Sequence, residues 1–258
     1  MKTETVLFLM GRVESSKCLQ PAIDVPQLFF SRFFAPLLLV VAIGAHAAPP
    51  AVAPEGMAPR VLACVACHGR EGRATNQGYF PRIAGKPAGY LYNQLLNFRD
   101  GRRSYPPMAL LLEHLSDAYL QEMAQHFADA DVPYPAPQTH NAPAATLAHG
   151  RRLALEGDPS RQLPACVACH GAALTGVKPF IPGLVGLPRD YLNAQLGAWQ
   201  SGQRKAHSPD CMGQIAAKLT PDDVGAVSTW LSSQVVTQGG KPAAALPAPL
   251  PMPCGGLE

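Results

Sequence analysis

The chain contains two copies of one segment, and this duplication constrains its fold more than any other feature. Residues 64–69 read CVACHG, and residues 166–171 repeat these letters 102 positions later. Further matches follow in the same order in both copies: Pro81 with Pro182, Tyr90-Leu91 with Tyr191-Leu192, Gln94 with Gln195, Arg103 with Arg204, and Met108 with Met212. A period near 100 residues is too long for a solenoid, whose repeats span about 20–50 residues, so the pattern predicts two tandem domains.

The boundaries of these domains follow from composition. Residues 131–143 are rich in proline and are expected to form a linker between the copies. The first domain then covers residues 48–130 and the second covers residues 144–236. Residues 237–258 are mostly Pro, Gly and Ala with almost no charge, and we expect them to form a disordered tail.

The N-terminal segment, residues 1–47, has the pattern of a signal peptide. Arg32 precedes the apolar stretch 33–45, and Ala45-His46-Ala47 provides the small residues of a cleavage site. The alternative is an uncleaved anchor helix, but the apolar stretch is too short for a comfortable membrane span. We therefore expect cleavage of this segment and export to the periplasm.

Composition excludes several classes of protein. The 21 Lys and Arg residues nearly balance the 18 Asp and Glu residues, which gives no support for nucleic-acid binding. An apolar content of 47% is ordinary for a globular chain and argues against wholesale disorder.

Each copy is predicted to be a small all-α unit. Apolar residues at helical spacing predict helices over 88–99 and 189–200, and a further helix over 144–155. Ser116 and Thr220 are expected N-caps of the last helix in each copy. No segment alternates convincingly between apolar and polar residues. Units of under 100 residues are too small to be robust on packing alone, so something else is expected to fill each core.

The two C-x-x-C-H motifs indicate which group is expected to complete each core. This spacing is the attachment signature of c-type haem, in which two thiols form thioethers and the histidine ligates the iron. A thioredoxin-like pair would need neither the histidine nor the duplication, and a zinc site would need its two halves closer together. The motifs therefore predict two covalently bound haem c groups, held by Cys64, Cys67 and His68 and by Cys166, Cys169 and His170.

A methionine in each copy is the candidate for the second axial ligand of the iron. Met108 and Met212 hold matching places, each in an irregular stretch before the last helix. A lone methionine would be taken as a core residue, but equivalent placement in both repeats favours ligation. The other candidate histidines do not recur in the second copy: His114, His126 and His207.

Four further repeat positions are expected around the haems. A carbonyl at Pro81 or Pro182 could accept the Nδ1–H of the motif histidine and orient its ring. Arg103 and Arg204 follow helix-ending glycines, where they either pair with haem propionates or solvate a helix C-terminus.

Taken together, the two motif sets with their methionines resemble the dihaem cytochrome c4 family over about residues 55–236. The resemblance implies two class I cytochrome c domains. It also implies a periplasmic electron carrier, sometimes membrane-associated, between a quinol:cytochrome c reductase-like donor and a terminal oxidase-like acceptor. Such a protein would have no catalytic residues and would not be an enzyme.

Cys211 keeps a second class of function open. Dihaem cytochromes of similar build serve as subunits of periplasmic dehydrogenases, and some dihaem sulfur-oxidising enzymes use cysteine as an axial ligand. Cys211 adjoins Met212, and Cys254 lies in the tail. These two thiols could pair in an oxidising compartment, or both could stay free.

Overall fold

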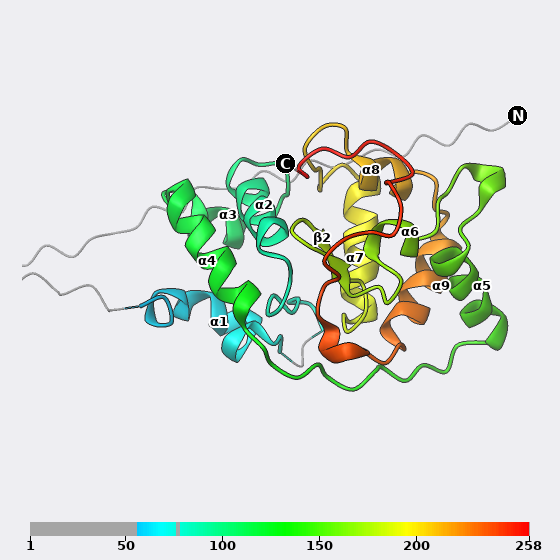
Figure 1. The fold of residues 1–258 in the computed structure, drawn as a ribbon, viewed down its shortest axis with the longest axis horizontal. Coiled ribbons are helices and arrows are strands. Elements are labelled where there is room, and N and C mark those ends of the chain that lie inside the picture. Colours follow the sequence, from blue (N-terminus) through cyan, green and yellow to red (C-terminus); the bar gives the residue numbers. More distant parts are fainter. Residues whose placement is uncertain (1–55, 76–77, 258) are drawn as a thin grey trace, which may run out of the picture. The chain divides into compact units, whose positions relative to one another are not determined.

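The computed structural model describes residues 56–75 and 78–257 (Figure 1). The expected signal peptide, residues 1–47, and the start of the expected first domain lie outside these residues. Within the described ranges, no helix has the length and apolar character needed to cross a membrane.

The described residues fold mainly into α-helices, which confirms the all-α prediction. The first copy contains α1 (Leu62–His68), α2 (Ala88–Arg99), α3 (Pro106–Leu112) and α4 (Asp117–Asp129). The second contains α5 (Ala144–Leu155), α6 (Val167–His170), α7 (Arg189–Gln200), α8 (Cys211–Ala216) and α9 (Pro221–Ser232). Single 3-10 turns are η1 (Pro59–Val61), η2 (Arg70–Gly72), η3 (Pro159–Arg161) and η4 (Gln238–Gly240).

A short hairpin in the second copy was not predicted. Strands β1 (Gly176–Val177) and β2 (Ile181–Pro182) pair antiparallel, with Gly176 opposite Pro182. Two residues per strand are too few for the alternation that marks a longer strand in a sequence. The hairpin follows α6 directly and returns the chain toward His170.

The predicted caps stand at the starts of the last helices. The Ser116 hydroxyl accepts a hydrogen bond from the Tyr119 N–H at the start of α4. Thr220 and Asp223 form a reciprocal capping box at the start of α9. These bonds satisfy backbone donors that the first helical turn leaves unpaired.

Each copy has its own buried cluster of apolar side chains. In the first, α2 packs on α4 around Leu91, Phe98, Leu112, Leu120 and Phe127. In the second, α5 and α7 pack on α9 around Ala154, Leu187, Leu192, Val227 and Leu231. Helices α5 and α9 approach so closely that a Cβ at Gly150 would collide with the Ala226 carbonyl.

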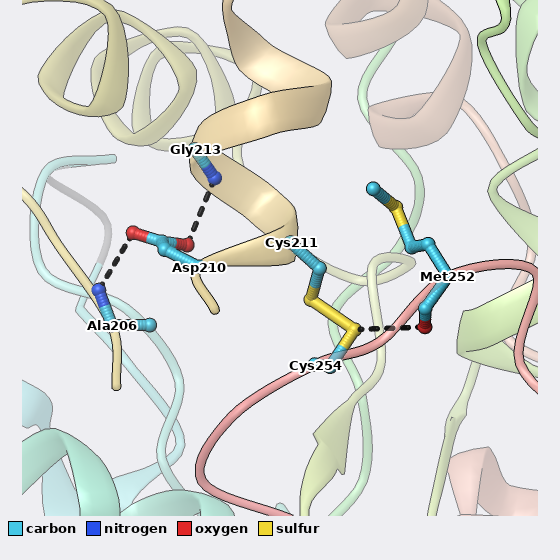
Figure 2. Close-up of a disulfide and its surroundings, with 6 residues drawn as sticks. All are labelled: Ala206, Asp210, Cys211, Gly213, Met252 and Cys254. Carbon is cyan, nitrogen blue, oxygen red and sulfur yellow. Dashed lines mark hydrogen bonds between the residues drawn. A yellow bond between two sulfur atoms is a disulfide. The ribbon is translucent and has the colours of Figure 1, made fainter. Parts of the chain in front are cut away.

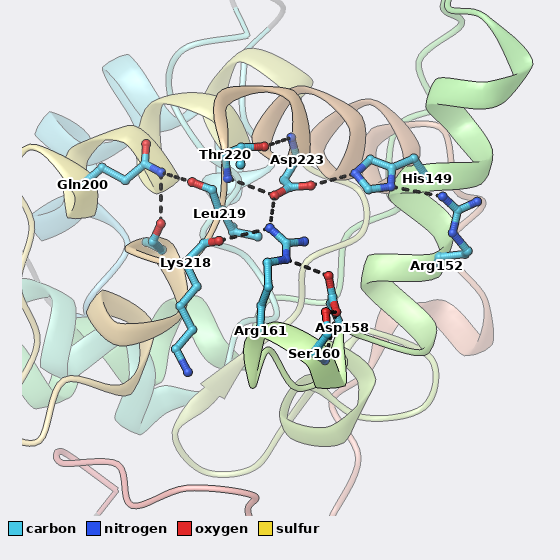
Figure 3. Close-up of polar contacts among 11 residues, drawn as sticks. His149, Arg152, Asp158, Ser160, Arg161, Gln200, Lys218, Leu219, Thr220 and Asp223 are labelled. Carbon is cyan, nitrogen blue, oxygen red and sulfur yellow. Dashed lines mark hydrogen bonds and ion pairs between the residues drawn. The ribbon is translucent and has the colours of Figure 1, made fainter.

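A polar network fastens α9 to the rest of the second copy (Figure 3). Arg161 donates to the carboxylates of Asp158 and Asp223, at 2.6 and 2.7 Å, and His149 lies 2.7 Å from Asp223. Burial alone would raise the pKa of the Asp223 carboxyl. The hydrogen bonds from Arg161, Thr220 and His149 outweigh that effect and hold the pKa well below its usual value.

Residues 238–257 follow a defined path, so the expectation of a disordered tail was wrong. The Ala243 N–H donates to Gly176 O at 2.9 Å, and the Gly255 N–H donates to Pro209 O at 2.9 Å. A disulfide also joins Cys254 to Cys211. Composition indicates low intrinsic order, but it does not reveal a crosslink or backbone pairing that holds such a segment in place.

Candidate functional site

Both cysteine motifs line one cavity of about 670 Å³. Its walls also include the two repeat-matched methionines and the aromatic residues Phe98 and Trp199. The cavity continues from one copy into the other. This is the space expected where an apolar cofactor completes two small cores.

The motif histidines are held in matching ways. His68 and His170 are 9% and 7% exposed, and each closes a short helix, α1 or α6. Their Nδ1 atoms lie 2.9 Å from Pro81 O and 2.7 Å from Pro182 O. Burial lowers the pKa of both rings, so each is neutral and donates its Nδ1–H to the proline carbonyl. The Nε2 lone pair is then available to a metal.

The motif cysteines are free thiols: Cys64, Cys67, Cys166 and Cys169. Burial raises the pKa of the Cys166 thiol to about 11 and also raises the pKa of Cys64 and Cys169. A redox-active pair requires a lowered thiol pKa, so a thioredoxin-like role does not fit. Among the described residues, no three His, Cys, Asp or Glu side chains gather into a group that could hold a metal ion.

Both candidate methionines lie in short helices, not in the irregular stretches that were expected. Met108 is in α3 and Met212 is in α8. Prolines occupy the first turn of α3, and the Asp210 carboxylate caps α8 by accepting from the Gly213 N–H at 2.9 Å. Helices α3 and α8 are so short that the spacing of apolar residues does not predict them, and their sequence signals are confined to the first turn. Both methionines line the cavity.

The repeated arginines meet between the two copies. Arg103 donates to Gln94 and Gln195, at 3.1 and 2.5 Å, and Arg204 donates to the same two side chains, at 3.0 and 2.7 Å. The guanidinium groups also stack on rings, Arg103 on Phe98 and Arg204 on Trp199. Arg204 is 5% exposed, so its expected alternative role in solvating a helix end was wrong. All four polar side chains line the cavity.

The side chains around the cavity meet the requirements for binding haem c. Each copy presents two free thiols, a neutral histidine with an oriented ring and a methionine, all on the wall of one apolar cavity. The half-buried Arg103 and the buried Arg204 line that cavity and supply positive charge that can pair with propionates. The residues present therefore fit the group.

A disulfide joins the first residue of α8 to the C-terminal tail (Figure 2). Cys211 and Cys254 are bonded, with their Cα atoms 5.1 Å apart and 43 positions apart in sequence. The Asn93 side chain of α2 donates to Gly256 O at 2.7 Å, so the tail also reaches the first copy. A disulfide sulfur is not a thiolate, so the hypothesis that Cys211 ligates the iron was wrong.

Sequence reasoning missed two further features of the site and left a third open. Gln94 and Gln195 recur in both copies, so their signal was present, but no chemistry had been assigned to them. The buried Lys86 has no repeat partner, because the second copy has Leu187 there. The pairing of Cys211 with Cys254 was left open, because Cys254 lies in a tail whose composition predicts disorder.

Comparison with known proteins assigns the chain to a family. No protein-family model matches. Cytochrome c4 of Pseudomonas aeruginosa is 32% identical over 189 residues, which cover 72% of this chain and 90% of that protein. The chain belongs to the dihaem cytochrome c4 family. It is therefore a dihaem electron carrier with two covalently bound haem c groups, and not itself an enzyme.

Two further relatives of this cytochrome carry a more specific name. The thiosulfate dehydrogenase electron acceptor of Thiomonas intermedia is 36% identical over 79% of this chain and 94% of that protein. The protein of the same name from Stutzerimonas stutzeri is 39% identical over 69% of this chain and 82% of that protein.

Solved structures agree in fold. Reduced cytochrome c4 from Pseudomonas stutzeri aligns with a TM-score of 0.57 at 28% identity, over 68% of this chain and 95% of that chain. Thiosulfate dehydrogenase TsdBA from Marichromatium purpuratum aligns with a TM-score of 0.60 at 34% identity. That match covers 67% of this chain but only 36% of the TsdBA chain.

Proposed function

We propose that this cytochrome accepts electrons from a thiosulfate dehydrogenase in the periplasm and passes them to a terminal oxidase-like acceptor. The observation that supports the donor is the pattern of identity. Two thiosulfate dehydrogenase electron acceptors share 36% and 39% of aligned residues with it, whereas cytochrome c4 of P. aeruginosa shares 32%. The onward acceptor is the one that the cytochrome c4 resemblance implies.

In this proposal each copy holds one haem. Cys64 and Cys67 would hold the first through thioether bonds, and His68 and Met108 would ligate its iron. Cys166, Cys169, His170 and Met212 hold the second. A bound haem c supplies an iron that cycles between ferric and ferrous states. We also propose removal of residues 1–47 on export, one domain each for residues 48–130 and 144–236, and 131–143 as their linker.

The chain's own residues prepare these sites for electron transfer. The Pro81 and Pro182 carbonyls fix each histidine ring, so the ligand does not reorient when the iron changes charge. Arg103 and Arg204, which we propose as propionate partners, also lock the two copies together through Gln94 and Gln195. A histidine and a methionine from each copy would ligate each iron and leave no position there for a substrate, which suits a carrier.

The donor is tested by mixing the oxidised cytochrome with a purified thiosulfate dehydrogenase and thiosulfate. We expect reduction of both haems, followed in the visible absorption spectrum, and none when either enzyme or thiosulfate is omitted. Cytochrome c4 of P. aeruginosa under the same conditions serves as the matched comparison and should be reduced more slowly. Failure of reduction by thiosulfate and enzyme, alongside rapid reduction by a quinol:cytochrome c reductase, would contradict the proposed donor.

A further inference from the structure

Lys86 is a buried cation between the two copies. Its side chain comes from the first copy and is 4% exposed, and its Nζ donates to Gly183 O of the second copy at 3.0 Å. Burial, together with the positive charge of Arg82, lowers the pKa of Lys86 to about 7. Burying an ammonium group costs folding free energy unless the group is hydrogen-bonded or paired with an opposite charge.

This ammonium lies against Pro182-Gly183, the segment that holds the His170 ring and is called the second histidine loop below. The first histidine loop is the matching segment Pro81-Arg82. Gly183 directly follows Pro182, whose carbonyl accepts the His170 Nδ1–H. Lys86, Gly183 and His170 line the same cavity.

The repeat alignment shows why this cation comes from the other copy. Gly183 matches Arg82, which lies next to Pro81 in the first copy. Arg82 is 3% exposed and donates to the Val132 and Pro133 carbonyls, so the first histidine loop carries its own buried cation. The second loop has no room for one, because a Cβ at Gly183 would lie 2.6 Å from Thr175 O.

The arrangement is not reciprocal. The residue of the second copy that matches Lys86 is Leu187, which is 7% exposed and belongs to the second apolar cluster. The second copy therefore supplies no matching cation to the first from this position. The charge of Lys86, which comes from the first copy, therefore lies at the haem site of the second copy, and this position provides no charge in the opposite direction.

We propose that Lys86 is a positioning residue of the first domain that raises the reduction potential of the second haem. The inference rests on the proposed ligands His170 and Met212. Losing an electron adds positive charge to the haem, and a nearby cation opposes that change most strongly in a low-dielectric interior. Lys86 thus stabilises the ferrous state of the second haem and favours electron arrival there. The potential of one domain then depends on the docking of the other.

Spectroelectrochemical titration of the holoprotein at pH 6, below the pKa of Lys86, tests this proposal. Lys86→Met should lower one midpoint potential and leave the other in place. Lys86→Gln keeps an N–H donor for Gly183 O but lacks the charge, so it should lower the same midpoint. Lys86→Arg retains the charge and should restore it. Leu187→Met, the matched apolar control, should leave both midpoints unchanged.

The affected haem is identified in a Met108→Ala background, where the remaining methionine–ferric absorption band reports the second iron alone. The midpoint of the band-bearing haem should be the one that falls. Unchanged midpoints in Lys86→Met and Lys86→Gln, an equal fall in Lys86→Arg, or a fall confined to the other haem would overturn the proposal. Persistence of both methionine bands in Met212→Ala would overturn the ligand assignment of the second haem and, with it, this inference.

Discussion

Replacing Met212 with alanine should abolish the methionine–ferric charge-transfer band of one haem and lower the reduction potential of that haem. A thioether ligand favours ferrous iron, and its loss leaves the site to water or a harder ligand. Met108→Ala should do the same to the other haem. The double variant should show no band. Near-infrared absorption of the oxidised proteins measures each effect.

Cys211→Ser is the matched control for Met212→Ala. Successive residues of a helix point about 100° apart, so Cys211 and Met212 cannot both face the iron. The Asp210 cap holds the start of α8 through bonds to Gly213 and Ala206, at 2.9 and 2.7 Å, without the disulfide. Cys211→Ser should therefore free the tail and keep both methionine bands. Conversion of a haem spectrum in Cys211→Ser would contradict the assignment.

Replacing Asp223 with alanine should destabilise the second domain by about 2–3 kcal/mol. The variant removes the capping box of α9 and leaves the Arg161 guanidinium and the Thr220 N–H without their buried acceptor (Figure 3). Guanidinium chloride unfolding of the holoprotein, followed by circular dichroism, measures the change.

Asp222→Ala is the control for the Asp223 variant. Asp222 is exposed in the same helical turn, and its loss should cost only about 0.5 kcal/mol through the helix dipole.

The depressed pKa of Asp223 also determines the direction in which the stability of the second domain changes with pH. Its contribution is full above the unfolded pKa of about 4 and is lost as the pH falls below that value. An Asp223→Ala protein as stable as Asp222→Ala would show that the network is not a major support.

The features that the sequence predicted correctly have strong local signals or recur in both copies. Helix α2 begins at Ala88 and ends at Arg99, as its apolar spacing predicts, and the caps at Ser116 and Thr220 form the expected bonds. The hydrogen bond between the motif histidine and a proline carbonyl was expected because Pro81 and Pro182 recur at nearly equal spacing.

The features that were missed depend on contacts between distant segments. Nothing local to Lys86 indicates that it donates to Gly183, 97 positions away. The pairing of Cys254 with Cys211 was only one of two open alternatives, because Cys254 lies in a segment whose composition predicts disorder and only the fold brings it to Cys211. Repetition singled out the arginines, but their crossed pairing with Gln94 and Gln195 arises from the docking of two copies.

The central claim is that each C-x-x-C-H motif holds one haem c covalently. Proteolysis of the purified exported protein, followed by mass spectrometry of the peptides, tests it most directly. One haem should be found on the peptide that contains Cys64, Cys67 and His68, and one on the peptide that contains Cys166, Cys169 and His170. A single haem-bearing peptide, or haem that acidic acetone extracts from the intact protein, would contradict the account.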